Sequence, residues 1–223
     1  MDNAQWQVDS GLSVILNAGG QSRRMGSNKA LLPVGGLPLI QHVALRLLSL
    51  VDERMLVIGN DPAVQAAVRI PRPTVALTDA WPDAGAVGGI ATGLAQVEGW
   101  AAVAACDLPL VRPEIFRHLL ALAQEAGPDG QPWDVVVPVV DDREQTMHAL
   151  YHRRCLPAIH AQLAEGRLRV NYFYDHVRVR RVSEDELRGI DPALHSFFNA
   201  NTPDEWAHAL DLLTREPDQS AGR

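Results

Sequence analysis

Short apolar, β-prone segments alternate with longer segments of helical spacing along most of this chain. Alternation of this kind favours a layered α/β fold, in which helices cover the faces of a central sheet. Residues 101–106 are small and wholly apolar, as expected for a strand that is buried on both faces of a parallel sheet. The sequence therefore predicts an α/β fold with a doubly wound, mainly parallel sheet.

The expected elements follow one another in a regular order. We expect strands at residues 12–16, 54–59, 74–78, 101–106, 134–139, 148–151 and 177–182. We expect helices at residues 38–51, 62–68, 87–97, 113–126, 156–163 and 203–213. Asn201 or Thr202 is expected to cap the last helix, with Pro203 in its first turn. The predicted organisation is a disordered extension at residues 1–10, a single domain at residues 11–214 and a tail at residues 215–223.

Size, charge and cysteine content exclude several classes of protein. A chain of 223 residues is long enough for one domain with a substantial core. Its net charge of −7 argues against a nucleic-acid-binding protein, and no apolar run approaches the length of a membrane span. Residues 1–10 lack the pattern of a secretory signal. Two cysteines without metal-type spacing fit a reduced, cytoplasmic protein.

A glycine-rich loop follows the first expected strand and ends at Lys29, the single lysine of the chain. Gly19 and Gly20 permit positive φ and can form a nest of N–H donors for a polyphosphate. A Gly-Gly turn often only joins a strand to a helix, but Arg23, Arg24 and Lys29 bring three cations to the same loop and favour anion binding. Every other basic residue is arginine, so lysine here suggests a site that a guanidinium fork does not fit. The spacing matches neither the P-loop nor the dinucleotide-binding fingerprint.

Two aspartates follow expected strands and should share an edge of the sheet with this loop, because ligands bind beyond the carboxyl ends of such strands. Asp107 directly follows residues 101–106. A carboxylate there is a natural ligand for Mg²⁺, which takes one or two carboxylates together with substrate phosphates. The alternative is that Asp107 caps the helix near Pro113 or forms an Asx-turn. For Asp79, both an Asx-turn and a ligand contact stay open.

Three motifs together resemble the molybdenum cofactor guanylyltransferases. They are Ala-Gly-Gly-x-Ser-x-Arg-Met-Gly-x-x-Lys at residues 18–29, Cys-Asp-x-Pro at residues 106–109 and Phe-x-Asn-x-Asn-Thr-Pro at residues 197–203. The first motif is specific to a nucleotidyltransferase superfamily, and the last narrows the resemblance to its molybdopterin branch. The resemblance covers roughly residues 12–213.

The resemblance implies a Rossmann-like nucleotidyltransferase fold and a reaction in which GTP and Mo-molybdopterin give the guanine dinucleotide cofactor and pyrophosphate, with Mg²⁺. It implies molybdoenzymes or cofactor-insertion proteins as further partners. Asp107 would hold Mg²⁺ and act in catalysis with Lys29 and Arg23. The residues expected to bind the nucleotide and its phosphates are Asn17, Ala18, Gly19, Gly20, Arg24, Lys29, Asn60, Asp79 and Asp107.

The chain departs from the family pattern at three positions. Members usually carry Leu before Ala-Gly-Gly, where this chain has Asn17, and often Asp before the lysine, where it has Asn28. Many have Gly-Pro where this chain has Gly85-Ala86. These departures leave open a different nucleotidyltransferase, which would make a cytidylyl derivative of the same pterin or an activated sugar or polyol. A non-catalytic carrier of nucleotide or cofactor is the alternative outside enzymes.

Overall fold

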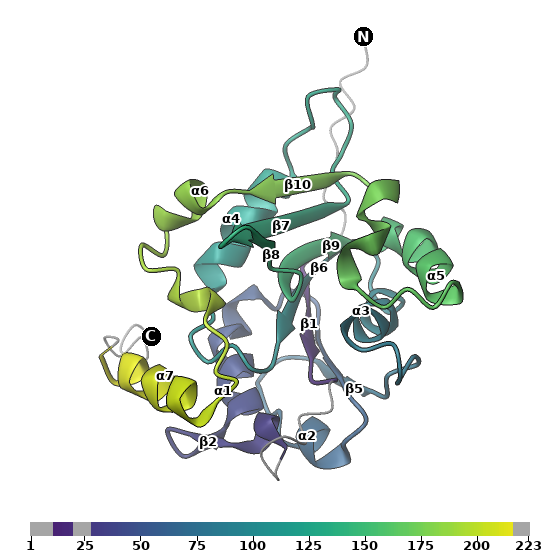
Figure 1. The fold of residues 1–223 in the computed structure, drawn as a ribbon. Coiled ribbons are helices and arrows are strands. Elements are labelled where there is room, and N and C mark those ends of the chain that lie inside the picture. The colour runs from purple at the N-terminus through teal and green to yellow at the C-terminus, as the bar shows by residue number, and fades with distance from the viewer. Residues whose placement is uncertain (1–10, 20–27, 216–223) are drawn as a thin grey trace.

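The computed structural model describes residues 11–19 and 28–215, which build an eight-stranded sheet with helices on both faces (Figure 1). The strand order is β10-β7-β9-β6-β1-β4-β5, and β8 pairs with β7. Most neighbouring strands are parallel, so the predicted doubly wound α/β fold is confirmed. Outside the described residues lie the expected N-terminal extension, nearly all of the expected tail, and the candidate site residues Gly20, Arg23 and Arg24.

The parallel strands form two groups within the sheet. The first group surrounds β1 (Ser13–Asn17) and consists of β6 (Trp100–Ala105), β4 (Met55–Ile58) and β5 (Thr74–Leu77). The second group is the edge pair β7 (Val135–Val140) and β10 (Val179–Val182). Between the groups lies β9 (His148–His152), which runs antiparallel to both of its neighbours, and β8 (Arg143–Glu144) is antiparallel to β7.

The helices match the expected positions, and the described residues contain one further α-helix. The expected helices are α1 (Leu39–Arg46), α2 (Pro62–Ala66), α3 (Ala86–Leu94), α4 (Pro113–Ala123), α5 (Leu156–Ala164) and α7 (Pro203–Arg215). The further helix is α6 (Glu184–Arg188). The short hairpin of β2 (Pro33–Val34) and β3 (Leu37–Pro38) was likewise not predicted, nor was β8. The helix expected at residues 38–51 ends at Arg46, and a separate 3-10 turn, η3 (Leu48–Leu50), follows it. No helix among the described residues is long and apolar enough to cross a membrane.

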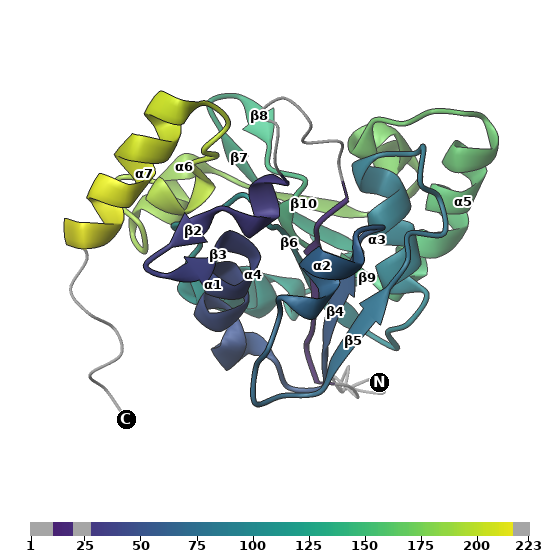
Figure 2. The same ribbon diagram turned by 90° about the horizontal axis from the view of Figure 1, so that it is seen from below.

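Alternate side chains of β1 supply the two halves of the core. Val14 and Leu16 belong to the apolar cluster that contains α1 and α4, whereas Ile15 belongs to the cluster on the other face with α3 and α5. Figure 2 shows α1 and α4 on one side of the sheet and α3 and α5 on the other. All three side chains are fully buried. Burial of each contributes about 1.5–3 kcal/mol, so β1 is held from both faces.

The order of the strands places the loops after β1 and β6 side by side. The chain passes from β1 to β4 on one flank and later returns to β6 on the other flank, so β1 and β6 border the topological switch of the sheet. The Cys106 N–H donates to the Asn17 carbonyl oxygen (3.2 Å) and joins the two strand ends. The candidate residues that follow these strands therefore meet at one edge of the sheet.

Candidate active site

A cavity of about 430 Å³ opens at the carboxyl ends of β1 and β6. The turn after β8 and the segment before α7 complete its walls. The volume lies in the range of small-molecule sites. Five of the predicted site residues line the cavity: Asn17, Ala18, Gly19, Lys29 and Asp107.

The Lys29 ammonium joins three distant segments at the wall of this cavity. The residue is only 6 % exposed. Its Nζ donates to Asp107 Oδ2 (3.0 Å) and to Asn201 Oδ1 (2.8 Å). An ammonium has three N–H donors, so these two contacts leave one donor for an anionic ligand. The buried positive charge is thereby paired by groups of the protein itself.

Asp107 lies two residues after the end of β6, and its carboxylate bonds to Lys29 instead of to a helix. The first turn of α4 begins after Arg112 without a side-chain cap, so the helix-cap interpretation of Asp107 is wrong. The Asp107 side chain is 26 % exposed at the cavity. Lys29 bonds to one of the two Asp107 carboxylate oxygens, and a carboxylate oxygen is the kind of hard donor that Mg²⁺ prefers. Among the described residues no group of three or more His, Cys, Asp or Glu side chains could hold a metal ion.

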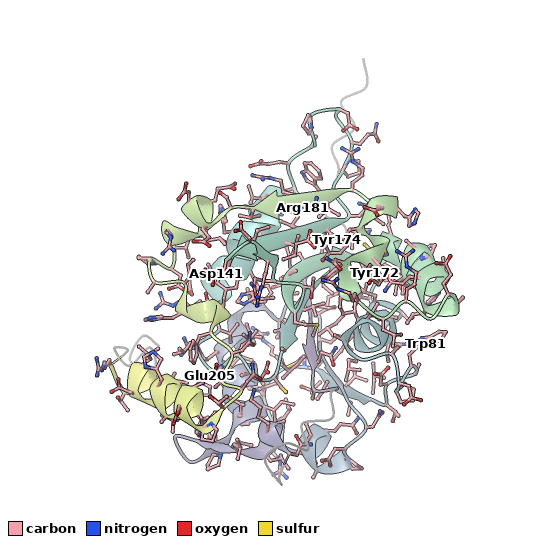
Figure 3. The ribbon with its side chains drawn as sticks, in the orientation of Figure 1. Trp81, Asp141, Tyr172, Tyr174, Arg181 and Glu205 are labelled. Atoms are coloured by element: carbon pink, nitrogen blue, oxygen red, sulfur yellow. The ribbon has the colours of Figure 1, made fainter. Side chains whose placement is uncertain are left out.

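The Asn201 amide is held in place by the start of α7. The Glu205 carboxylate accepts from the backbone N–H groups of Asn201 and Thr202 (both 2.8 Å), and Thr202 Oγ1 accepts from the Glu205 N–H (3.2 Å). Figure 3 shows Glu205 at this end of the helix. The two backbone donors lower the pKa of Glu205, so the carboxylate stays charged. Thr202 caps α7 and Pro203 opens it, as predicted, but the contact of Asn201 with Lys29 was not predicted.

Asn17 at the end of β1 organises the loop that follows. Its side chain is buried, its Oδ1 accepts from the Gly19 N–H (2.9 Å), and its Nδ2 donates to the Ala86 carbonyl oxygen (3.2 Å). The Gly19 N–H is therefore bonded to a side chain here, which differs from the open amide nest that the sequence suggested. A Cβ on Gly89 would lie 2.4 Å from Asn17 Nδ2, so only glycine leaves room for the amide against α3.

Asp79 and Asn60 lie beside the loop but outside the cavity lining. The Asp79 N–H donates to Asn60 Oδ1 (3.0 Å), which ties together the ends of β5 and β4. Asp79 Oδ1 accepts from the Trp81 N–H (2.9 Å), so the Asx-turn is present, and the ligand contact stays a prediction. A Cβ on Gly19 would lie 3.7 Å from Asp79 Oδ2, which places this carboxylate next to the loop.

The chemistry of the cavity favours the binding and positioning of phosphates over covalent catalysis. Burial and the neighbouring Asp107 raise the pKa of the Cys106 thiol to about 12, so the thiol is neutral at physiological pH. The thiolate is the nucleophilic form of cysteine, and Cys106 does not supply it. The remaining polar groups are a buried ammonium, a partly exposed carboxylate and several amides. Such groups can hold anions and oriented polar ligands.

Comparison with known proteins agrees with this interpretation. The family described as MobA-like NTP transferase domain matches residues 14–179. A molybdenum cofactor guanylyltransferase of Desulfosudis oleivorans is 33% identical over 200 residues, which are 89% of this chain and 93% of that protein. A probable molybdenum cofactor guanylyltransferase of Pelotomaculum thermopropionicum is 34% identical over 202 residues, or 87% of this chain and 90% of the relative.

A solved structure extends the likeness to three dimensions. The molybdopterin-guanine dinucleotide biosynthesis protein A of Archaeoglobus fulgidus superposes with a TM-score of 0.77 at 25% sequence identity, and the match covers 92% of this chain and 100% of that one. The described fold, the cavity and these relatives agree that the chain is a nucleotidyltransferase. The chain belongs to the MobA-like NTP transferase family and, within it, to the molybdenum cofactor guanylyltransferases.

Proposed function

We propose that this protein transfers GMP from GTP to Mo-molybdopterin, forming the guanine dinucleotide cofactor and releasing pyrophosphate. A terminal phosphate oxygen of molybdopterin forms a bond to the α-phosphorus of GTP. The bond from that phosphorus to the bridging oxygen of pyrophosphate breaks, and its electron pair leaves with the pyrophosphate. The names of the relatives support this reaction. The structural observation that carries it is the contact of Lys29 with both Asp107 and Asn201 at one cavity.

Lys29 acts on the triphosphate by neutralising charge. Its remaining donor faces an acceptor on the polyphosphate, and its buried position strengthens that contact relative to water. The incoming phosphate of molybdopterin is already an anionic nucleophile, so the site needs no strong general base. Positioning of the two substrates and stabilisation of the growing negative charge then account for the rate.

Asp107 is the residue that would hold Mg²⁺ at this site. When bound, the ion offsets the repulsion between two anionic substrates. Asp107 keeps the Lys29 ammonium oriented toward the cavity, and Asn201 holds the same ammonium from the other side. Asn17 fixes the first residues of the phosphate loop against the start of α3.

Pyrophosphate release tests the proposal directly. Each of the four nucleoside triphosphates is supplied with Mg²⁺, with and without Mo-molybdopterin. We expect release with GTP that depends on the pterin, and strong rejection of ATP, because a site that hydrogen-bonds one base edge leaves polar groups unpaired with another. Comparable release with CTP would indicate a cytidylyltransferase. Release with a sugar or polyol phosphate in place of the pterin would indicate that branch, and nucleotide binding without release would indicate a carrier.

A further inference from the structure

Asn28, the residue before Lys29, has both ends of its side chain engaged. Its Oδ1 accepts from the Ala30 N–H (3.2 Å) and caps the 3-10 turn η2 (Lys29–Leu31). Its Nδ2 donates to Asp61 Oδ2 (2.8 Å), although 33 residues separate the two positions. An amide offers one acceptor and one donor end, whereas a carboxylate offers acceptors only. Both contacts together therefore require asparagine at position 28.

Asp61 uses both of its oxygens in a complementary way. Oδ1 accepts from the Ala63 N–H (2.9 Å) and caps α2, while Oδ2 accepts from Asn28. These hydrogen bonds lower the pKa of Asp61, and the bond from Asn28 contributes most. The carboxylate is thus charged and holds one donor with each oxygen. We call the pair of Asn28 and Asp61 the clasp.

The clasp fixes the backbone from which the Lys29 side chain starts. The Leu31 N–H donates to the Asn28 carbonyl oxygen (2.9 Å), so Asn28 closes the turn that begins with Lys29. From this turn the Lys29 side chain reaches Asp107 and Asn201 at 3.0 and 2.8 Å. N–H···O hydrogen bonds lie between about 2.7 and 3.2 Å, so both contacts depend on where the turn places the start of the Lys29 side chain.

We propose that the clasp positions Lys29: it ties the end of the phosphate loop to the start of α2, so that the ammonium meets Asp107 and Asn201 at the cavity. Asn28 and Asp61 are positioning residues, and their effect on turnover rests on the proposed function. Here the asparagine faces a carboxylate at position 61, so a donor meets an acceptor.

Exchanging the two side chains tests the proposal. In Asn28→Asp, two carboxylates face each other and no donor remains between them. In wild type, the Ala63 N–H and Asn28 Nδ2 each bond to a separate oxygen of Asp61. In Asp61→Asn, the single amide oxygen must accept from both of these donors. In the double variant Asn28→Asp/Asp61→Asn, the carboxylate at position 28 accepts from the Ala30 N–H and from the new amide at position 61, whose oxygen still caps α2. The exchange therefore restores every contact with the donor and acceptor reversed.

Two measurements follow the position of the ammonium. The first is the rate at which an amine-directed acylating reagent modifies Lys29, the only lysine in the chain, measured by mass spectrometry with the N-terminal amine as internal reference. The second is kcat and KM for pyrophosphate release with Mg-GTP and Mo-molybdopterin. We expect Lys29 to be acylated at least about tenfold faster in Asn28→Asp, the scale of one hydrogen bond to a charged group. We expect a smaller increase in Asp61→Asn, and a return to within about twofold of wild type in the double variant.

A helix cap that does not line the cavity provides the matched control. Ser183 caps α6 with a capping box, so Ser183→Ala should lower the melting temperature but leave Lys29 acylation and KM unchanged. The proposal is overturned if Asn28→Asp leaves Lys29 as protected as in wild type, or if the double variant stays as reactive as Asn28→Asp. If the wild-type protein releases no pyrophosphate with GTP, the proposed function fails, while the acylation rates still decide whether the clasp positions Lys29.

Discussion

Lys29 Nζ and Asp107 Oδ2 lie 3.0 Å apart, although 78 residues separate them in the sequence. Lys29 follows the loop after β1, Asp107 lies two residues beyond β6, and the parallel pairing of these strands brings the two loops together. Removal of either partner leaves the other as a partly buried charge without its counter-charge, which is costly. The pair therefore links the stability of this edge of the sheet to the chemistry of the cavity. Each of the two residues can be tested separately by substitution.

Lys29→Arg keeps the charge but should lose most of the activity. The ammonium sits between two partners at 3.0 and 2.8 Å in a site that is only 6 % exposed. A planar guanidinium is broader and presents its donors in a fixed fork, so it cannot make both contacts in the same space. We expect kcat/KM for pyrophosphate release to fall at least about a hundredfold, the scale of removing one key electrostatic contact.

The reverse exchange on the surface is the control for this variant. Arg153 forms an exposed ion pair with Glu98, so Arg153→Lys should leave both kcat/KM and the melting temperature unchanged. A fully active Lys29→Arg protein would show that the size of the cation does not matter at this site.

Asp107→Asn should leave the fold intact and remove most of the turnover. The amide keeps the size of the side chain and an oxygen that can accept from Lys29, and the carboxylate caps no helix in the structure. Loss of the negative charge removes the hard ligand proposed for Mg²⁺. We expect kcat to fall at least about a hundredfold, and the folded protein to have a lower melting temperature because the Lys29 ammonium loses its counter-charge. The control is Asp129→Asn, which removes an exposed carboxylate that pairs with Arg178 and should leave turnover normal. Normal turnover of Asp107→Asn at saturating Mg²⁺ would contradict the proposed metal site.

The edge of the sheet that carries the site was predictable from the sequence, because local patterns determine it. The apolar strand at residues 101–106 ends in a charged residue, the first strand ends in glycines, and a doubly wound sheet brings such ends together. The antiparallel direction of β9 was not predicted. Only residues 141–147, including the short strand β8, join β7 to β9, and a parallel connection needs a crossover of about a dozen residues or more.

Long-range side-chain contacts account for the part of the site that was not predicted. Asn201 lies 172 residues from Lys29, and its neighbours Thr202 and Pro203 carry the local signal of a helix start. Because of this local signal, the sequence predicts only a helix cap in this segment and no contact with the site. By contrast, α6 has a capping box of Ser183 and Glu186, a local pattern from which the helix could have been predicted.

Asn17→Ala should loosen the loop that follows β1. The variant loses the bonds to the Gly19 N–H and the Ala86 carbonyl oxygen, and it leaves those backbone groups without their partner. An unsatisfied buried polar group costs about 1–3 kcal/mol, so we expect a lower free energy of unfolding in denaturant titrations. Because the loop is proposed to hold the triphosphate, KM for GTP should rise more than kcat falls.

Asn17→Leu separates hydrogen bonding from volume, because leucine is similar in size to asparagine but has no polar side-chain atom. It fills the site but cannot bond to Gly19 or Ala86, so KM should rise as in Asn17→Ala. A wild-type KM in Asn17→Leu would show that the two hydrogen bonds do not organise the loop.

His148 should make the protein less stable in acid. Its ring lies between Phe116 and Phe197, with centroid distances of 4.5 Å to each. Burial lowers the pKa of His148 to about 3, although the Ser196 backbone and Asp191 favour the charged form. In the unfolded chain the same group titrates near its ordinary pKa of about 6.5. Between these two values the unfolded state binds one more proton than the folded state, so stability falls as the pH decreases from about 6.5 to about 3.

His148→Phe removes this proton and keeps an aromatic ring between the two phenylalanines. The free energy of unfolding, measured by urea titration at several pH values, should favour the variant increasingly as the pH drops. The difference from wild type should grow by up to about 1.4 kcal/mol per pH unit below about pH 6.5 and should not change above it. All other titrating groups are common to both proteins, so they cancel in the difference. A difference that stays constant from neutral pH down to about pH 4 would mean that His148 is not held neutral by the fold.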